Sequence, residues 1–197
     1  MYAASMSLRI LVIGATCAAA LAAPPALAQP AVGELARLFG ALCVAGHGES
    51  APAMAAARRE GFTPTGAAQV ASVVGQAHVE GAQVRARAQG HRTTFLVTGL
   101  TTVSSVGPVT LCLVTERPVT SEARAAAVQA LLAMAPLPHD PQANAVFAFV
   151  EHDNARQSIA DLPRDQLQAA MTGRQVRLVV VDDPHGSLAY SAMRPLP

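Results

Sequence analysis

The chain has 197 residues, of which 51% are hydrophobic and 14% are charged, and its formal net charge is +1. A charge this close to zero argues against a nucleic-acid partner, since such proteins carry an excess of basic residues that pairs with phosphates. Aromatic residues make up only 4% of the chain and tryptophan is absent, which leaves little material for the stacking surfaces that bind sugars or single strands.

The first 28 residues have the organisation of a secretory signal peptide. The single charge of Arg9 precedes an apolar stretch from Ile10 to Ala23, and the small residues of Ala26-Leu27-Ala28 follow. The apolar stretch is shorter than the roughly 20 residues that a membrane-spanning helix needs. We therefore expect cleavage after Ala28, leaving one exported domain of residues 29–197, periplasmic or secreted, with no membrane span.

Two cysteines, Cys43 and Cys112, remain in the expected mature chain, because Cys17 falls in the signal peptide. An oxidising compartment favours a disulfide between them. In the chain-entropy model a bridge over roughly 70 residues stabilises a fold by about 4 kcal/mol. A metal pair or a reactive thiol is less favoured, since the two cysteines form no Cys-x-x-Cys motif.

Helical patterns open the mature chain. Apolar residues recur at the helical interval from Glu34 to Gly46, with Cys43 on the buried stripe. An alanine-rich stretch from Pro52 to Glu60 predicts a second helix. The pattern from Ala67 to Gln76 fits either a helix or a loop.

From Val79 onward the hydrophobic period changes to two, which predicts a strand that pairs with Thr93 to Thr98 in a hairpin. Arg85 and Arg87 alternate with valine and alanine, so we expect them on the wet face of that strand. With Arg92 they would form a basic stripe for an anionic ligand, or would simply keep the face solvated.

A third strand is expected from Val109 to Thr115, with Leu111 and Leu113 on one face and Cys112 on the other. If the first helix covers the face of Cys112, the disulfide ties that helix to the sheet. The preceding segment, Leu100 to Val106, is expected as a loop, either an ordinary solvated one or a hairpin tip that meets a partner.

The second half alternates helices with strands. We expect a helix from Ser121 to Ala133, a strand from Val146 to Val150, a helix from Pro163 through Met171, and a closing hairpin of Val176 to Val181 with Leu188 to Ala192. The whole order predicts an α+β domain with a mainly antiparallel sheet of five to six strands, packed with three to four helices.

The sequence predicts no catalytic residue, cofactor site or metal ligand, because no motif with the required spacing is present. The histidines of His139-Asp140 and His152-Asp153 adjoin carboxylates, but neighbours in a strand point to opposite faces. Asp182, Asp183 and His185 are better placed, since they could converge at the end of a hairpin, although aspartate is also an ordinary turn residue.

Several segments resemble a group of known sequences. They are Leu38-Phe39 through Leu42-Cys43, the alanine-rich helix ending in Glu60-Gly61-Phe62, Thr94-Phe95-Leu96-Val97-Thr98-Gly99, and Leu111-Cys112-Leu113-Val114. Together these segments are similar to small exported proteins of unknown function from alphaproteobacteria. The resemblance covers most of the mature chain and implies a paired-cysteine periplasmic domain, without a catalytic residue.

We therefore expect an exported, non-enzymatic domain that binds a protein or small-molecule partner through its sheet or loops. The alternative is a small hydrolase or metal-dependent enzyme centred on Asp182, Asp183 and His185. A hydrolase would also need a nucleophile such as Ser187, or one of Ser104-Ser105, within reach of a histidine.

Overall fold

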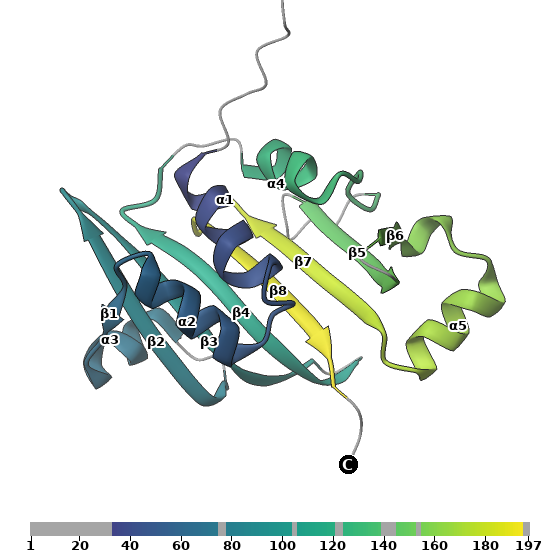
Figure 1. Cartoon of the computed structure of the whole chain (residues 1–197), viewed down its shortest axis with the longest axis horizontal. Coiled ribbons are helices and arrows are strands. Elements are labelled where there is room, and N and C mark those ends of the chain that lie inside the picture. The colour runs from purple at the N-terminus through teal and green to yellow at the C-terminus, as the bar shows by residue number, and fades with distance from the viewer. Residues whose placement is uncertain are drawn as a thin grey trace, which may run out of the picture.

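A computed structural model describes residues 33–74, 78–103, 106–120, 124–138, 145–152 and 155–194. The predicted signal peptide lies outside these residues, as do His139-Asp140, Asp153 and Ser104-Ser105. The described residues form one antiparallel sheet with helices on both of its faces (Figure 1).

The sheet has eight strands in the order β1-β2-β3-β4-β8-β7-β5-β6. In chain order the strands are β1 (Thr63–Pro64), β2 (Glu80–Gln89), β3 (Arg92–Val103), β4 (Gly107–Arg117), β5 (Ala145–His152), β6 (Ala155–Ser158), β7 (Val176–Asp182) and β8 (Ser187–Met193). The prediction of five to six strands was wrong because β1 and β6, at the two edges, are too short to display an alternating pattern.

Five α-helices occur in the described part of the chain, against the three to four expected. They are α1 (Glu34–Phe39), α2 (Ser50–Arg59), α3 (Ala67–Val74), α4 (Arg124–Leu132) and α5 (Arg164–Thr172). A π-helical turn, Gly40–Val44, continues α1, and a 3-10 turn, Ile159–Asp161, precedes α5. The additional helix is α3, whose sequence also fitted a loop. None of the described helices is both long and apolar enough to cross a membrane.

The main core lies between the sheet and the layer formed by α1, α2 and α4. Strand alternation places four fully buried side chains in one row across β4, β8, β7 and β5, namely Cys112, Tyr190, Val179 and Phe147. Cys43 in the π-helical turn is bonded to Cys112, with 5.5 Å between the two Cα atoms. The predicted disulfide between helix and sheet is thereby confirmed.

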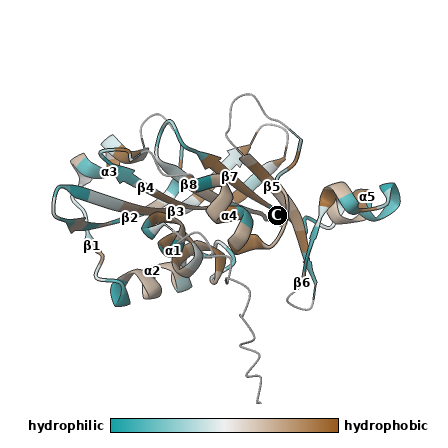
Figure 2. Cartoon of the chain, turned by 90° about the horizontal axis from the view of Figure 1, so that it is seen from above, coloured by the Kyte–Doolittle hydropathy of each residue, from teal (hydrophilic) through white to brown (hydrophobic). Residues whose placement is uncertain are grey.

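The opposite face of the sheet is covered differently along its width. Over β2 and β3, α3 packs Val70 and Val73 against Val84, Phe95 and Val97. Figure 2 shows α3 on this side, across the sheet from α1 and α2, while α5 lies beyond the end formed by β5 and β6. α5 therefore extends from the sheet, and only Ala170 is buried among its residues.

Arg85 and Arg87 lie on the face of the sheet that α1 and α2 cover. This corrects the prediction that they form a basic stripe on a solvated face. Arg87 contacts Glu34 at 2.6 Å and Glu60 at 3.6 Å, and its side chain is only 13% exposed. Its guanidinium also lies over the ring of Phe62, 5.4 Å from the ring centre. The end of α2 covers this face, so the arginines are anchored by carboxylates and main-chain carbonyls instead of water.

Candidate functional site

The hairpin acids proposed for an enzyme are divided between two partners. The Nδ1 atom of His185 is 2.8 Å from Asp182, while Asp183 accepts a hydrogen bond from Arg124 at 3.4 Å. Asp182 is the last residue of β7 and Asp183 lies in the turn that follows, so the two carboxylates reach different partners. Within the described ranges, no group of three His, Cys, Asp or Glu side chains is placed to hold a metal ion.

The hydroxyl of Ser187 lies near this hairpin but not on its imidazole. It donates to the hydroxyl of Thr115 at 2.9 Å and to the main-chain carbonyl of His185 at 3.2 Å. These bonds join the start of β8 to β4 and to the turn after β7, so Ser187 has structural partners in place of a catalytic base.

A different region, which we call the α5 pocket, combines space with polar groups. It is a cavity of about 470 Å³ between α5 and the ends of β5, β6 and β7, within the range of roughly 300–1,000 Å³ that small-molecule sites occupy. Its lining residues are Val150, Glu151, His152, Gln157, Leu162, Gln166, Ala169, Ala170, Gln175 and Arg177.

Three glutamines in the α5 pocket come from three separate parts of the fold. Gln157 belongs to β6, Gln166 to α5, and Gln175 precedes β7. Each amide offers two donors and a carbonyl acceptor, so together they suit a ligand with several polar atoms. The small side chains of Ala169 and Ala170 leave the space open on the side of α5.

Glu151, the carboxylate of the α5 pocket lining, is held in ionised form. One of its oxygens is 2.8 Å from Nδ1 of His47, and the other accepts from Nε of Arg156 at 3.0 Å. Burial by itself would raise the pKa of Glu151, but the hydrogen bonds from His47 and Arg156 outweigh it, and the net shift is downward. Both oxygens are therefore engaged by other side chains of the protein.

Arg177 and Tyr190 lie on the same side of the sheet as Glu151. The Tyr190 ring packs edge-on against Phe149, with 6.2 Å between ring centres, and its hydroxyl is buried without an acceptor for its proton among the described residues. Burial and the negative charge of Glu151 raise the pKa of Tyr190, and the nearby guanidinium groups of Arg177 and Arg156 offset only part of that effect. The phenol therefore stays protonated and keeps a proton to donate.

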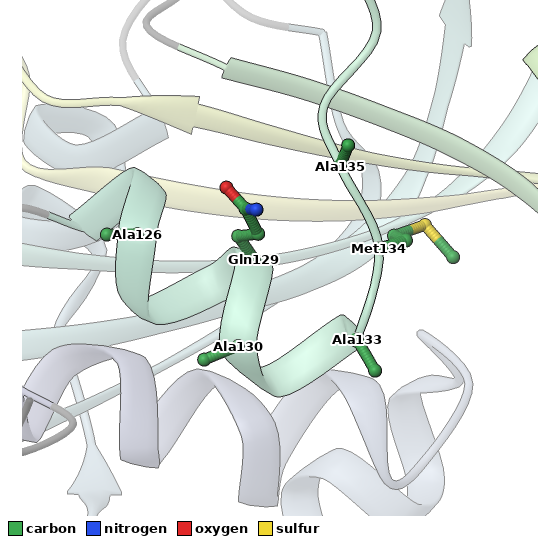
Figure 3. Close-up of a pocket in the computed structure, with 6 residues that line it drawn as sticks. All are labelled: Ala126, Gln129, Ala130, Ala133, Met134 and Ala135. Carbon is green, nitrogen blue, oxygen red and sulfur yellow. The ribbon is translucent and has the colours of Figure 1, made fainter. Parts of the chain in front are cut away.

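Three further pockets differ from the α5 pocket in volume and in the side chains that line them. A groove of about 500 Å³ runs along α4 and the segment after it, and Gln129 is its one polar side chain among five alanine and methionine residues (Figure 3). An apolar hollow beside Met171 measures only about 80 Å³. A third, of about 310 Å³, has Arg156 in its wall, but that guanidinium is bound to Glu151.

The α5 pocket was not predicted from the sequence. Its polar residues are single positions in different elements, and only the path of the chain between β5 and β7 brings them together. In the sequence, the pocket is marked only by the regular spacing of its glutamines, which are nine residues apart. This spacing matches no motif that predicts a binding site. Comparison of this chain with protein-family models, curated proteins and solved structures found no match.

Proposed function

We propose that this chain is an exported, non-enzymatic domain that binds a small polar molecule in the α5 pocket. The observation that carries the proposal is the convergence of three glutamine amides and Arg177 on one cavity of about 470 Å³. Apolar side chains, among them Val150 and Leu162, line the same cavity and would contact the hydrocarbon part of a bound ligand.

Export is supported by two independent features. The first 28 residues have the pattern of a signal peptide, and a disulfide of the kind between Cys43 and Cys112 persists in oxidising compartments. The test is N-terminal sequencing of the protein recovered from its own cells. A mature chain that begins at Gln29 is the expected result, and a chain that retains Met1 would contradict export.

The enzymatic alternative centred on Asp182, Asp183 and His185 has less support. It requires the three side chains to act together, whereas Asp183 pairs with Arg124 and Asp182 with His185. The α5 pocket offers a binding site that needs no such rearrangement.

Ligand binding is tested by filling the α5 pocket from its α5 wall. The substitution Ala169→Phe places a ring in the cavity, and Ala55→Phe, on an exposed position of α2, is the matched control. The purified full chain is screened by thermal denaturation against amino acids, short carboxylic acids, amides, sugars and nucleosides. We expect at least one class to raise the Tm, because a ligand that binds only the folded state stabilises it.

The two variants then locate the binding. Ala169→Phe is expected to abolish the Tm shift, while Ala55→Phe leaves it unchanged. The proposal is wrong if no class raises the Tm, or if the shift survives in Ala169→Phe.

A further inference from the structure

Arg177 is a cation without a counter-ion inside the described part of the chain. No carboxylate of that part lies within 4.0 Å of its guanidinium; Nη1 donates only to the main-chain carbonyls of Gln175 and Val176, at 3.3 and 3.5 Å. Its Nε is buried and has no hydrogen-bond partner. Partly buried charges are normally paired, since removal from water is costly, so this guanidinium calls for an anion.

The acid that lines the same pocket does not serve that purpose. Glu151 also lines the α5 pocket, but its two oxygens are taken by His47 and Arg156. The negative charge of Glu151 therefore compensates that of Arg156, and the positive charge of Arg177 remains uncompensated in the same cavity.

Tyr190 provides a second polar group without an acceptor, next to Arg177. Arg177 is opposite Ala192 in the register of β7 and β8, which places it diagonally next to Tyr190 on the same face of the sheet. The buried hydroxyl of Tyr190 has no acceptor for its proton among the described residues, and the guanidinium of Arg177 acts on it as a nearby donor. The Nε of Arg177, which has no acceptor, and the hydroxyl proton of Tyr190 thus lie on the same face of the sheet, and Arg177 also lines the α5 pocket.

We propose that the ligand of the α5 pocket is a small organic monocarboxylate and that Arg177 binds its carboxylate group. The inference rests on the proposed function, since it names the ligand class of that same pocket. A guanidinium suits a carboxylate because its planar N–H groups can donate two parallel hydrogen bonds.

Charge balance distinguishes a monocarboxylate from a phosphate. One uncompensated cation faces the cavity, and the carboxylate of Glu151 in the same lining would repel a second negative charge. The three glutamine amides add neutral hydrogen bonds, and the walls formed by Val150, Leu162 and Ala170 suit a short hydrocarbon part.

The test compares acids with their neutral analogues on the purified full chain. Monocarboxylates of four to eight carbons, the corresponding primary amides and inorganic phosphate are titrated at one ionic strength, by calorimetry and by thermal denaturation. We expect at least one acid to bind at least tenfold more tightly than its amide, because the amide cannot form the charged pair with Arg177.

Three arginine variants distinguish binding at Arg177 from a general effect of positive charge. Arg177→Met is expected to abolish acid binding, whereas Arg164→Met, on an exposed position at the start of α5, is expected to keep it. Without ligand the Tm of Arg177→Met should not fall, since the substitution removes an unpaired charge. Arg177→Lys should retain weaker binding, because an ammonium lacks the planar pair of donors.

The outcomes test the carboxylate assignment, the role of Arg177 and the proposed function separately. Equal binding of acid and amide, or tighter binding of phosphate, overturns the carboxylate assignment and leaves a ligand pocket in place. Acid binding that persists in Arg177→Met overturns the role of Arg177. If no compound of either screen binds, the carboxylate assignment and the proposed function both fail.

Discussion

Gly48 lies directly against the ring of Tyr190. A Cβ atom on Gly48 would come within 2.6 Å of Cδ1 of that ring, and the residue has a φ of +74°. The loop after the π-helical turn can therefore pass over the buried tyrosine only because this position has no side chain.

The first prediction concerns that contact. Gly48→Ala should lower the free energy of unfolding by about 3 kcal/mol, since backbone strain and overpacking each cost about 1–3 kcal/mol. Gly81→Ala is the control, because Gly81 has a φ of +63° but no atom within 4 Å of a built Cβ, so only strain of about 1 kcal/mol applies. Urea unfolding measures both, and equal losses would contradict the packing role of Gly48.

The disulfide gives the second prediction. Replacing Cys43 and Cys112 together by alanine should lower the free energy of unfolding by about 4 kcal/mol, the loop-entropy value for a sequence separation of 69. Both sulfurs are fully buried, so alkylation of the native protein without reductant should label neither. Labelling of either sulfur before unfolding would show that the bond is not formed in the native protein.

The third prediction concerns the buried pair of Glu116 and Arg124, which lie 2.5 Å apart with almost no exposed surface. The Thr120 hydroxyl also donates to Glu116. Arg124→Met leaves the carboxylate without its cation and should cost about 3–5 kcal/mol.

Two further variants control this result. Adding Glu116→Gln to Arg124→Met should recover part of the loss, because the uncompensated charge is removed. Asp183→Asn, which alters a longer and more exposed contact of the same arginine, should have little effect. Denaturant unfolding of the three variants checks the order, and an Asp183→Asn loss as large as that of Arg124→Met would contradict it.

The fourth prediction is a pH dependence. A hydrogen bond from Arg37, aided by Arg87, lowers the pKa of Glu34 from 4.5 to about 2, even though burial acts in the opposite direction. A carboxyl with a lowered pKa stabilises the fold above its unfolded-state value, and this contribution is lost as the pH falls from about 4.5 to about 2. Because Glu34 is partly exposed, high salt should weaken the effect.

Glu34→Gln should therefore flatten the decline of Tm across that acid range. Glu80→Gln is the control, since Glu80 is exposed and has no ion pair with a described residue. If both variants follow the unsubstituted protein, the ion pairs of Glu34 do not contribute to acid stability.

Local patterns in the sequence predicted much of the architecture. The helix that carries Cys43 and the strand that carries Cys112 each show a clear period, and an isolated pair of cysteines leaves one pairing. The closing hairpin of β7 and β8 was likewise predicted from its turn residues. Edge strands were missed because two or four residues contain too few alternations to detect.

The sequence by itself determined the longer helices and strands, because periodicity depends on local spacing, and it determined which cysteines meet, because only two lie beyond the predicted signal peptide. Only the tertiary structure decided that Arg87 is sheltered beneath α2 and that three glutamines share a cavity with Arg177. A strand pattern identifies two faces but not which of them is covered, and residues 20 positions apart meet only once the path of the chain is known.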